Sequence, residues 1–481
     1  MSTTTDEHCG CETVKRALII AAGKGSRFGS KTNYRPKPLI SVGGLPLILR
    51  TIYTAREVGV REFVVVTGFL ADELENFLSS NAPQDITVRF VYNELWERPN
   101  GWSVYKAKDE FQDGEPFFLM MSDHVTEPSL LKILAAKPLS GRSCRLAVDF
   151  NPSRVPDIEE ATKVWVDEEG LIRRIGKQIK DFNGVDTGFF LCSGEIFTAL
   201  EEALAEGKET LSDGIQKLAD RGLMESADIG SIFWQDVDNE EDLRRAESYL
   251  FDSLKSRTDS WLTKLINRRI SLVITKRIAN FPITPNQITV INFLIGITGC
   301  LAILHGTPLS IAAGSVVFLL SSILDGCDGE LARLRFQKSQ IGAWLDVTTD
   351  NVVHWFLFYA LTASAVNRHG LFPYGLFGAL LLLGSFVSFV LTWFAPAKVS
   401  TSRTAGPPGL LFSEATLKDL VPLENQDALS SLVDKAANHD FAYLLVLLSL
   451  FDRSHWFLFL GGIGAPIFAW MLYRRIISGR R

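Results

Sequence analysis

The second half of the chain contains long apolar stretches with few charges. A helix that crosses a bilayer needs about 20 mostly apolar residues. Six stretches approach this length, at residues 288–304, 310–324, 347–366, 375–395, 441–451 and 456–473. The second and the fifth are short, and we expect each to continue into its flanking residues. The first half alternates charged and apolar runs, so the sequence predicts a soluble head followed by an all-α domain of six transmembrane helices.

Positive charges indicate how these helices cross the membrane. Basic residues lie before the first stretch, after the second, after the fourth and at the end of the chain, whereas the other turns carry only Arg368 and Arg453. Cytoplasmic loops are enriched in Lys and Arg. We therefore expect a multi-pass protein of the cell (inner) membrane, with the head and both termini in the cytoplasm. Residues 256–284 are expected to form a basic helix at the membrane surface.

Composition excludes some classes of function and indicates a polar N-terminal tail. The formal net charge is −6, so no overall basicity argues for a nucleic-acid partner. Residues 1–14 are polar and lack the apolar core of a signal peptide, which predicts a disordered tail. Cys9 and Cys11 lie near His8, but no second pair of ligands follows, so we favour the tail over a metal site.

The head, expected at residues 15–255, alternates strand and helix patterns. The predicted strands are Lys15–Ala22, Glu62–Thr67, Ile86–Tyr92, Phe117–Ser122 and Ser143–Phe150, and the predicted helices between the early strands are Pro46–Val58 and Leu70–Ser79. Such alternation is typical of an α/β domain with a mostly parallel sheet.

A glycine-rich turn follows the first predicted strand, with the sequence Ala-Ala-Gly-Lys-Gly-Ser-Arg-Phe-Gly at residues 21–29. It is not a Walker loop, because no Gly-Lys-Ser/Thr ends it, and it is a poor Rossmann fingerprint, because the third glycine would fall at Phe28. Glycines let backbone amides approach phosphate oxygens, and Lys24 and Arg27 add positive charge. An ordinary strand-to-helix turn is the alternative.

Lys37 lies between two prolines ten residues after Arg27, in the segment Pro-Lys-Pro-Leu at residues 36–39. A restricted lysine can direct a fixed positive charge at a phosphate during substitution. With the glycine-rich turn, this segment resembles the sugar-phosphate nucleotidyltransferases over residues 17–250. The resemblance implies a Rossmann-like α/β fold of the GT-A type, in which Gly23, Gly25 and Arg27 hold a nucleoside triphosphate and Lys37 contacts its phosphates.

Two further predicted strands end in acids, at Asp123 and at Asp236 and Asp238. The first lies where the nucleotidyltransferases place a magnesium ligand. Mg²⁺ prefers one or two carboxylates together with substrate phosphates. Asp123 with Asp238 or Asp236 would supply them, and Mn²⁺ could replace Mg²⁺. The alternative for each acid is a helix cap or a turn.

Three other segments indicate the substrates. Asn100 and Ser103 lie in a segment that resembles the nucleobase site of cytidylyltransferases, and Lys163 and Asp186 lie in segments that resemble those meeting the acceptor phosphate and its polyol. The closest likeness is to inositol-1-phosphate cytidylyltransferases, which implies CTP and inositol 1-phosphate as substrates. An exposed strand lysine and a hairpin turn remain the alternatives for the last two residues.

An acidic pattern, D-x2-D-G-x2-A-R-x8-G-x3-D-x3-D, begins at the end of the second apolar stretch. Its acids are Asp325, Asp328, Asp346 and Asp350. Acids three or four residues apart share one face of a helix. Carboxylates at the end of a membrane helix are costly and indicate function, and four of them would repel one another unless divalent cations lay between them. The pattern therefore predicts a two-metal site that binds a pyrophosphate.

Small residues in the same pattern predict close contact between its two helices. Gly329, Ala332 and Gly342 have little or no side chain, and small residues let membrane helices approach each other.

Every position of this pattern matches the CDP-alcohol phosphotransferase family, and the resemblance extends over residues 284–475. It implies that Asp325, Asp328 and Asp346 bind metal and that Asp350 is a ligand or the general base. Arg333 would help to neutralise the CMP that leaves a CDP-alcohol. A homodimer through the membrane domain, expected at residues 285–481, and contact with the lipid bilayer are further expectations.

The order of the two parts resembles the bifunctional enzymes that make CDP-inositol and then di-inositol phosphate phosphate. This resemblance implies transfer of phosphoinositol to inositol 1-phosphate. Three alternatives stay open: another alcohol phosphate, a lipid acceptor with a phospholipid product, or a membrane protein whose head only senses nucleotide. Residues 396–438 match nothing in this pattern and leave the acceptor open.

Overall fold

The computed structural model describes residues 14–28, 34–111, 115–254, 266–394 and 441–478. The chain divides into two compact units, residues 1–250 and 251–481, which are described separately below. The predicted tail before residue 14, Lys264 of the basic segment and the segment 396–438 lie outside the described residues.

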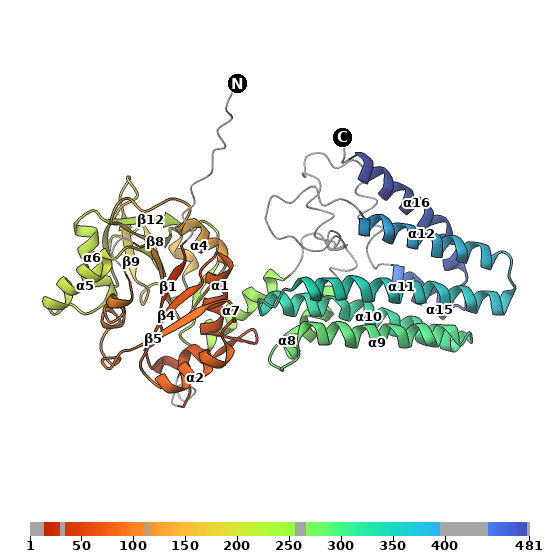
Figure 1. Ribbon diagram of the computed structural model, residues 1–481, viewed down its shortest axis with the longest axis horizontal. Coiled ribbons are helices and arrows are strands. Elements are labelled where there is room, and N and C mark those ends of the chain that lie inside the picture. The colour runs from red at the N-terminus through yellow and green to blue at the C-terminus, as the bar shows by residue number, and fades with distance from the viewer. Residues whose placement is uncertain (1–13, 29–33, 112–114, 255–265, 395–440, 479–481) are drawn as a thin grey trace, which may run out of the picture. The chain divides into compact units, whose positions relative to one another are not determined.

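A nine-stranded mixed sheet forms the centre of the first unit (Figure 1). Its main strands run in the order β10-β9-β11-β6-β1-β4-β5, and β8 pairs with β11 and β12. Their bounds are β1 Arg16–Ile20, β4 Glu62–Thr67, β5 Thr87–Tyr92, β6 Phe117–Met121, β8 Cys144–Asp149, β9 Lys163–Val166, β10 Ile172–Gly176, β11 Gly184–Cys192 and β12 Met224–Asp228. Two small ribbons accompany the sheet, β2 Ser41–Val42 with β3 Leu45–Pro46 and β7 His124–Thr126 with β13 Trp234–Asp236.

The predicted mostly parallel sheet is wrong. Strands β1, β4, β5 and β6 pair in parallel, but β11 is antiparallel to β6, β8 and β9. The early strands β1 and β4 are continuous apolar runs that are buried almost throughout, a pattern typical of parallel sheets. The later strands β9 and β10 form a hairpin across a short turn, and such a connection requires antiparallel pairing.

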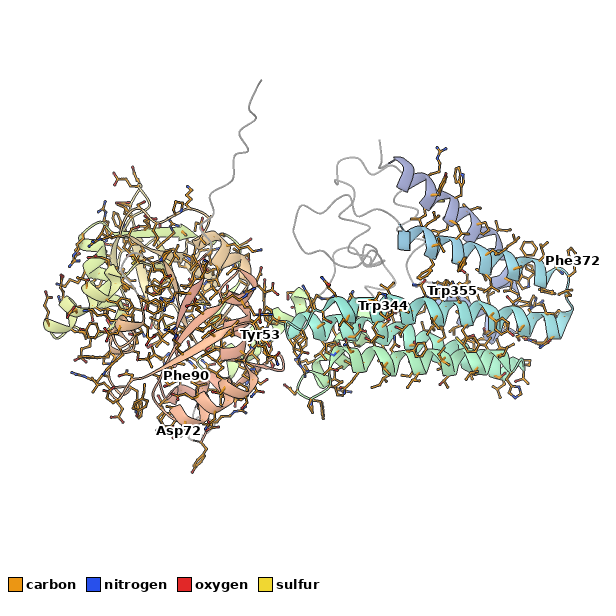
Figure 2. The ribbon with its side chains drawn as sticks, in the orientation of Figure 1. Tyr53, Asp72, Phe90, Trp344, Trp355 and Phe372 are labelled. Carbon is orange, nitrogen blue, oxygen red and sulfur yellow. The ribbon has the colours of Figure 1, made fainter. Side chains whose placement is uncertain are left out.

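Seven described α-helices lie around the sheet, the last of which continues past the end of the first unit, and side chains fill the space between them (Figure 2). They are α1 Leu47–Glu57, α2 Ala71–Asn81, α3 Gly101–Tyr105, α4 Pro128–Leu134, α5 Glu195–Ala205, α6 Leu211–Asp220 and α7 Glu240–Ser253, and a short 3₁₀ turn, η2, spans Lys37–Leu39. Each strand and helix predicted between residues 15 and 150 is present within one or two residues of its predicted bounds.

The second unit is helical. Its helices are α8 Arg268–Ile278, α9 Pro285–Leu304, α10 Pro308–Leu334, α11 Gln340–His369, α12 Tyr374–Phe394, α15 Phe441–Leu450 and α16 Trp456–Ser478. Helices α9 and α10 each start with a threonine N-cap, Thr284 and Thr307, and a proline in the first turn, which satisfies the free amides of the helix end.

All six apolar stretches predicted as membrane helices are helical, but their lengths differ. In the described part of the chain, four helices are long and apolar enough to cross a membrane: Pro285–Leu304, Pro308–Leu334, Tyr374–Leu391 and Trp456–Arg474. Helix α11 has 30 residues and carries two acids of the motif. Helix α10 extends beyond its predicted bounds, as expected, whereas α15 has only 10 described residues and what precedes it lies outside the described part.

Helices α9 and α10 are in direct backbone contact through two glycines. A Cβ atom added to Gly314 would lie 2.5 Å from the carbonyl oxygen of Gly299, and one added to Gly299 would lie 2.9 Å from the carbonyl oxygen of Gly314. The predicted role of Gly329 in helix packing is wrong, because an added Cβ would meet only Arg333 of the same helix. The close approach therefore lies about three turns before Asp325, the first acid of the motif on α10.

Replacing Gly314 with Ala should destabilise the helical unit, because the methyl group has no room against the α9 backbone. We expect a loss of about 1–3 kcal/mol, typical of overpacked cores, measured as a lower apparent melting temperature in detergent. Gly464→Ala on α16 is the matched control, because nothing lies within 4 Å of its added Cβ. Equal melting temperatures for the two variants would contradict the close contact.

Candidate active sites

The first candidate site lies where β1 and β6 end, and a glycine provides space for its lysine. Gly25 has φ +65, and a Cβ there would lie 2.7 Å from Cβ and from Cδ of Lys37. The side chain of Lys37 therefore runs directly over the glycine-rich turn. Gly23 lies in the same turn and has open space at its Cβ position. The sequence motif thus brings the turn and Lys37 together, as predicted.

The ammonium of Lys37 bridges two of the predicted acids. Its Nζ lies 2.6 Å from Oδ2 of Asp123 and 2.6 Å from Oδ1 of Asp238. Burial disfavours the charge, but Asp123, Asp236 and Asp238 outweigh it and raise the pKa of Lys37 above its ordinary value. Burial opposes ionisation of Asp123, yet Lys37 and His124 hold its pKa well below the usual range. Both groups are therefore charged at neutral pH.

Arg27 is also tied to this cluster. Its guanidinium forms an ion pair with Asp238, and Nη2 lies 3.7 Å from Oε2 of Glu160. The Arg27 side chain is 55% exposed, so solvent weakens both pairs and an incoming anion can compete for the guanidinium.

His124 is a residue of this site for which the sequence suggested no role. Its Nδ1 lies 2.8 Å from Oδ1 of Asp123 and 3.9 Å from Oδ1 of Asp236. Burial opposes protonation of the ring, but Asp236 and Asp123 raise its pKa to about 9. The ring also stacks on Trp234. The feature of the sequence that could have indicated a role for His124 was its position directly after the predicted ligand Asp123.

The acids of this site suit a divalent cation. Asp123, His124 and Asp236 offer ligand atoms that all lie within 4.8 Å of one another. Among the described residues, Oδ1 of Asp236 is buried without a hydrogen-bond partner, and burial raises the pKa of this carboxyl to about 6. An unsatisfied carboxylate oxygen beside a second carboxylate is a suitable ligand set for a hard cation. Asp236 and Asp238 both remain candidates for the second ligand.

In this structure, the residues predicted to meet the nucleobase form hydrogen bonds to other residues of the protein. Oδ1 of Asn100 accepts a hydrogen bond from the amide of Leu211, the first residue of α6. Ser103 is buried, and its Oγ accepts a hydrogen bond from Asn93. Lys24 instead lies over the ring of Phe69, with its Nζ 5.6 Å from the ring centre.

The residues predicted to meet the alcohol phosphate are neighbours in the sheet. Lys163 on β9 pairs with Val185, the residue before Asp186 on β11. Nζ of Lys163 donates to the carbonyl oxygens of Glu159 and Lys177, at 3.3 and 2.8 Å. Burial raises the pKa of Asp186 to about 6, although the amide of Gly188 donates to its Oδ1 at 2.7 Å.

The second candidate site is an acidic cluster formed by α10 and α11. Asp325, Asp346 and Asp350 each offer a carboxylate oxygen, and these atoms all lie within 4.8 Å of one another. Oδ1 of Asp346 is buried with no hydrogen-bond partner among the described residues. Three carboxylates converging in this way fit a divalent cation for the same reason as in the first unit.

Two polar residues of α9, Thr289 and Asn292, support the acidic cluster. Thr289 donates a hydrogen bond to Oδ2 of Asp328, whose Oδ1 accepts from the amide of Gly329 at 2.5 Å. Nδ2 of Asn292 donates to Oδ1 of Asp325 at 3.1 Å. Each carboxylate oxygen of Asp328 thus accepts from one neutral donor, and Asp328 is not one of the three acids whose oxygens converge. Two buried polar residues one turn apart in an apolar helix were the sequence signal for this support.

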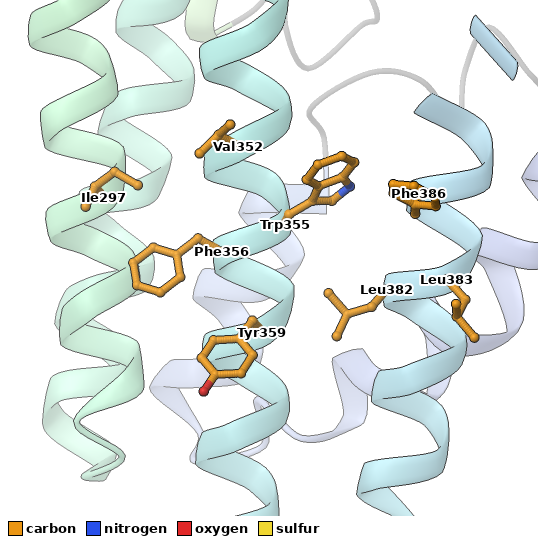
Figure 3. Close-up of a pocket in the computed structure, with 8 residues that line it drawn as sticks. All are labelled: Ile297, Val352, Trp355, Phe356, Tyr359, Leu382, Leu383 and Phe386. Atoms are coloured by element: carbon orange, nitrogen blue, oxygen red, sulfur yellow. The ribbon is translucent and has the colours of Figure 1, made fainter. Parts of the chain in front are cut away.

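A larger hollow among the described residues of the helical unit lies between α11 and α12 and has an apolar lining. A groove of about 630 Å³ between α11 and α12 is lined by apolar and aromatic residues, among them Trp355, Tyr359 and Phe386 (Figure 3). The pocket that contains Asp325 and Asp350 has only about 20 Å³. A nucleotide diphosphate needs charged and polar partners, so the small acidic pocket is the candidate site.

Comparison with known families assigns both units. Residues 17–209 match the MobA-like NTP transferase domain family, and residues 282–417 match the CDP-alcohol phosphatidyltransferase family. The chain is 34% identical over 378 residues to the bifunctional IPC transferase and DIPP synthase of Aquifex aeolicus (strain VF5), covering 77% of this chain and 82% of the relative.

The corresponding protein of Thermococcus kodakarensis is also 34% identical, over 77% of this chain and 80% of the relative. The chain belongs to the family of bifunctional IPC transferases and DIPP synthases. A solved inositol-1-phosphate CTP transferase from T. maritima aligns with 49% of this chain and 96% of its own length, at 28% identity and a TM-score of 0.44.

Membership of this family confirms the resemblance seen in the sequence. The chain is an enzyme with a nucleotidyltransferase domain followed by a CDP-alcohol phosphotransferase domain. The family match and the four apolar helices indicate a membrane protein. Both families generally depend on divalent metals, which agrees with the two clusters of acids.

Replacing Asp186 with Asn should stabilise the first unit at pH 7. An ionised Asp186 bears the cost of burial in the folded state, where its pKa is about 6, against 3.8 as the ordinary value. The asparagine keeps the acceptor for Gly188 and bears no such cost. We expect a gain of roughly 1–3 kcal/mol above pH 6, disappearing below about pH 4, where both states are protonated.

This pH dependence can be followed by thermal unfolding in parallel buffers. Asp181→Asn changes an exposed carboxylate in the preceding turn and should have little effect on the melting temperature. A stabilisation by Asp186→Asn that is equal at pH 4 and pH 7 would contradict the assignment.

Proposed function

We propose that this enzyme performs two successive reactions with inositol 1-phosphate. The head joins CTP and inositol 1-phosphate to give CDP-inositol and pyrophosphate. The tail then transfers phosphoinositol from CDP-inositol to a second inositol 1-phosphate and releases CMP. The convergence of Asp325, Asp346 and Asp350 from two helices is the observation that carries the proposal, because it provides a site for pyrophosphate chemistry in the membrane unit.

In the head, charge placement suits attack of a phosphate on the α-phosphate of CTP. The amides around Gly23 and Gly25 and the charges of Lys24 and Arg27 would hold the triphosphate. Lys37 would leave its ion pairs with Asp123 and Asp238 and stabilise the charge that develops on the transferred phosphate. Asn100 and Ser103 would define the base pocket, and Lys163 and Asp186 would hold the alcohol phosphate.

In the tail, Asp350 would take the proton from the attacking hydroxyl. It lies beside Asp325 and Asp346 in the pocket between α9, α10 and α11. The hydroxyl oxygen then forms a bond to the β-phosphate of CDP-inositol, the bond to the bridging oxygen breaks, and CMP leaves. Arg333, at the end of α10, would help to neutralise the CMP phosphate.

Magnesium is the proposed metal at both acid clusters, with Mn²⁺ as a possible substitute. Asp123 with Asp236 or Asp238 would hold it in the head. In the tail, Asp325, Asp346 and Asp350 would hold it where their oxygens converge, and the motif adds Asp328 as a fourth proposed ligand. When bound, it would neutralise phosphate oxygens and favour the leaving group.

The alcohol is the least constrained part of the proposal. The same residues could act on another alcohol phosphate, or the tail could use a lipid acceptor. Incubating the protein with CTP and a panel of phosphorylated alcohols, and then identifying the products by mass, separates these possibilities. The proposal fails if inositol 1-phosphate yields no CDP-alcohol while another compound of the panel does.

The membrane arrangement is also proposed. We infer a multi-pass protein of the inner membrane with the head, both termini and the basic loops in the cytoplasm, where CTP is found. A homodimer through the transmembrane helices and six crossings of the bilayer belong to the same proposal.

The two reactions should be separable by mutation. Asp123→Ala should lower CDP-inositol formation by roughly 100-fold or more, because it removes electrostatic stabilisation in the head, while transfer from supplied CDP-inositol continues. Asp346→Ala should have the opposite effect. Pyrophosphate release and CMP release are the two measurements. Loss of both activities in one folded variant would refute the division into two independent sites.

Topology can be tested at the two ends of α11. Leu371 is 74% exposed in the turn that leads to α12, next to Phe372 in Figure 2, and Lys338 lies before the first residue of the helix. In intact cells, a membrane-impermeant maleimide should label Leu371→Cys directly and Lys338→Cys only after permeabilisation. The reverse order of labelling would refute the proposed orientation.

A further inference from the structure

Glu330 is a fully buried acid inside the acidic motif, at a position that the motif itself leaves open. Its side chain is 0% exposed. Helix α8 donates three hydrogen bonds to it: Arg268 Nη1 at 2.8 Å and Ser271 Oγ at 2.7 Å to Oε1, and Thr275 Oγ1 at 2.7 Å to Oε2. Both carboxylate oxygens are therefore satisfied by one neighbouring helix.

Helix α8 is held to α10 by polar contacts rather than by apolar packing. Ser271 and Thr275 are its buried residues, whereas Ile270 and Val273 are 42% and 53% exposed. Arg335 adds a second attachment, because its guanidinium donates to the carbonyl oxygens of Ala279, Phe281 and Ile283 just after α8. The hydrogen bonds to Glu330 and Arg335 thus determine where α8 lies against α10.

These contacts hold the acidic end of α10 from the side opposite the carboxylates. Residues two apart on a helix point in different directions, so Glu330 faces α8 while Asp328 faces α9 and accepts from Thr289. The last turns of α10 are therefore hydrogen-bonded on two sides, by α9 through Asp325 and Asp328 and by α8 through Glu330.

We propose that Glu330 is a positioning residue for the transferase centre. By pairing with α8 it fixes the rotation of the end of α10 and so directs Asp325 toward Asp346 and Asp350 of α11. This inference rests on the proposed metal-binding function of that cluster. Residues that orient metal ligands from behind typically affect metal affinity by about 10–100-fold when they are changed.

The test measures metal binding directly, without substrate. The full chain carries Asp123→Ala in every sample, to remove the proposed ligand of the head, and Mn²⁺ binding is followed by electron paramagnetic resonance in detergent. Glu330→Gln keeps the shape and one carbonyl acceptor but loses the charge opposite Arg268. We expect the dissociation constant for Mn²⁺ to rise about tenfold. Arg268→Met should have a similar effect, because it leaves the buried carboxylate without its cation.

A matched control separates positioning from simple loss of stability. Ser315→Ala removes a buried hydrogen bond between the same helix and α15, where the two hydroxyl oxygens of Ser315 and Ser449 lie 2.8 Å apart. It should lower the melting temperature without changing the affinity for Mn²⁺. If Glu330→Gln lowers stability but leaves Mn²⁺ affinity unchanged, the positioning role is overturned.

Asp325→Asn distinguishes failure of this inference from failure of the proposed function. If Asp325→Asn leaves Mn²⁺ binding intact, the metal site of the tail is wrong. If Asp325→Asn weakens binding and Glu330→Gln does not, only the role of Glu330 is wrong. Should Glu330→Gln fail to fold, Thr275→Val removes one of the three hydrogen bonds and should raise the dissociation constant about threefold, and an unchanged constant would overturn the proposal.

Discussion

Repulsion between buried carboxylates is the constraint on which both sites depend. Each unit brings at least three acids together, at strand ends in the head and within α10 and α11 in the tail, and each site offsets the repulsion differently. In the head, the ammonium of Lys37 lies between Asp123 and Asp238, so a protein cation offsets the negative charge. In the tail, the hydrogen-bond donors to Asp325 and Asp328 are the neutral groups of Asn292 and Thr289. Neutral donors orient carboxylates without cancelling their charge, so the tail cluster remains strongly attractive to a divalent cation.

The same constraint requires close packing around the acids. Charged groups that lie close together need close neighbours, and glycines provide the space for this packing. Gly25 allows Lys37 to pass over the glycine-rich turn, and Gly188, with φ +77, leaves room for the ring of His124. In the membrane unit, Gly299 and Gly314 bring α9 and α10 into backbone contact. Thr289 and Asn292 on α9 then reach the acids of α10.

The sequence predicted the elements and the charged clusters well, for physical reasons that can be named. Continuous apolar runs such as β1 and β4 are bounded by turn residues, and the spacing of Asp325, Asp346 and Asp350 fixes their helix faces. The antiparallel pairing of β11 with β6, β8 and β9 was not predictable, because the residues of a strand do not reveal which strand it will pair with. The acids of the 396–438 segment could not be assigned to any motif, although the family match extends to residue 417.

Contacts that join distant parts of the sequence escaped prediction for a different reason. Glu330 and Arg268 are 62 positions apart, so no local spacing in the sequence links them. His124 directly follows Asp123 in the sequence, so proximity to that acid could be expected. Its proximity to Asp236 is visible only in the fold. Residues that orient a metal-binding acid can be recognised only from the neighbouring helix or strand that they contact. The acids themselves can be recognised from their spacing in the sequence.

In the membrane unit, the chemical nature of a pocket's lining indicates the candidate active site better than the volume of the pocket does. The described residues that line the groove of about 630 Å³ beside Trp355 and Phe386 are all uncharged, whereas the pocket of about 20 Å³ contains Asp325 and Asp350. A pyrophosphate group placed in the groove would lose its hydration without gaining a partner, and an unpaired buried charge is strongly unfavourable. At the acidic pocket, the carboxylates can share cations with the phosphates. The chemistry of the lining therefore makes the acidic pocket, and not the apolar groove, the candidate site for a substrate that carries phosphates.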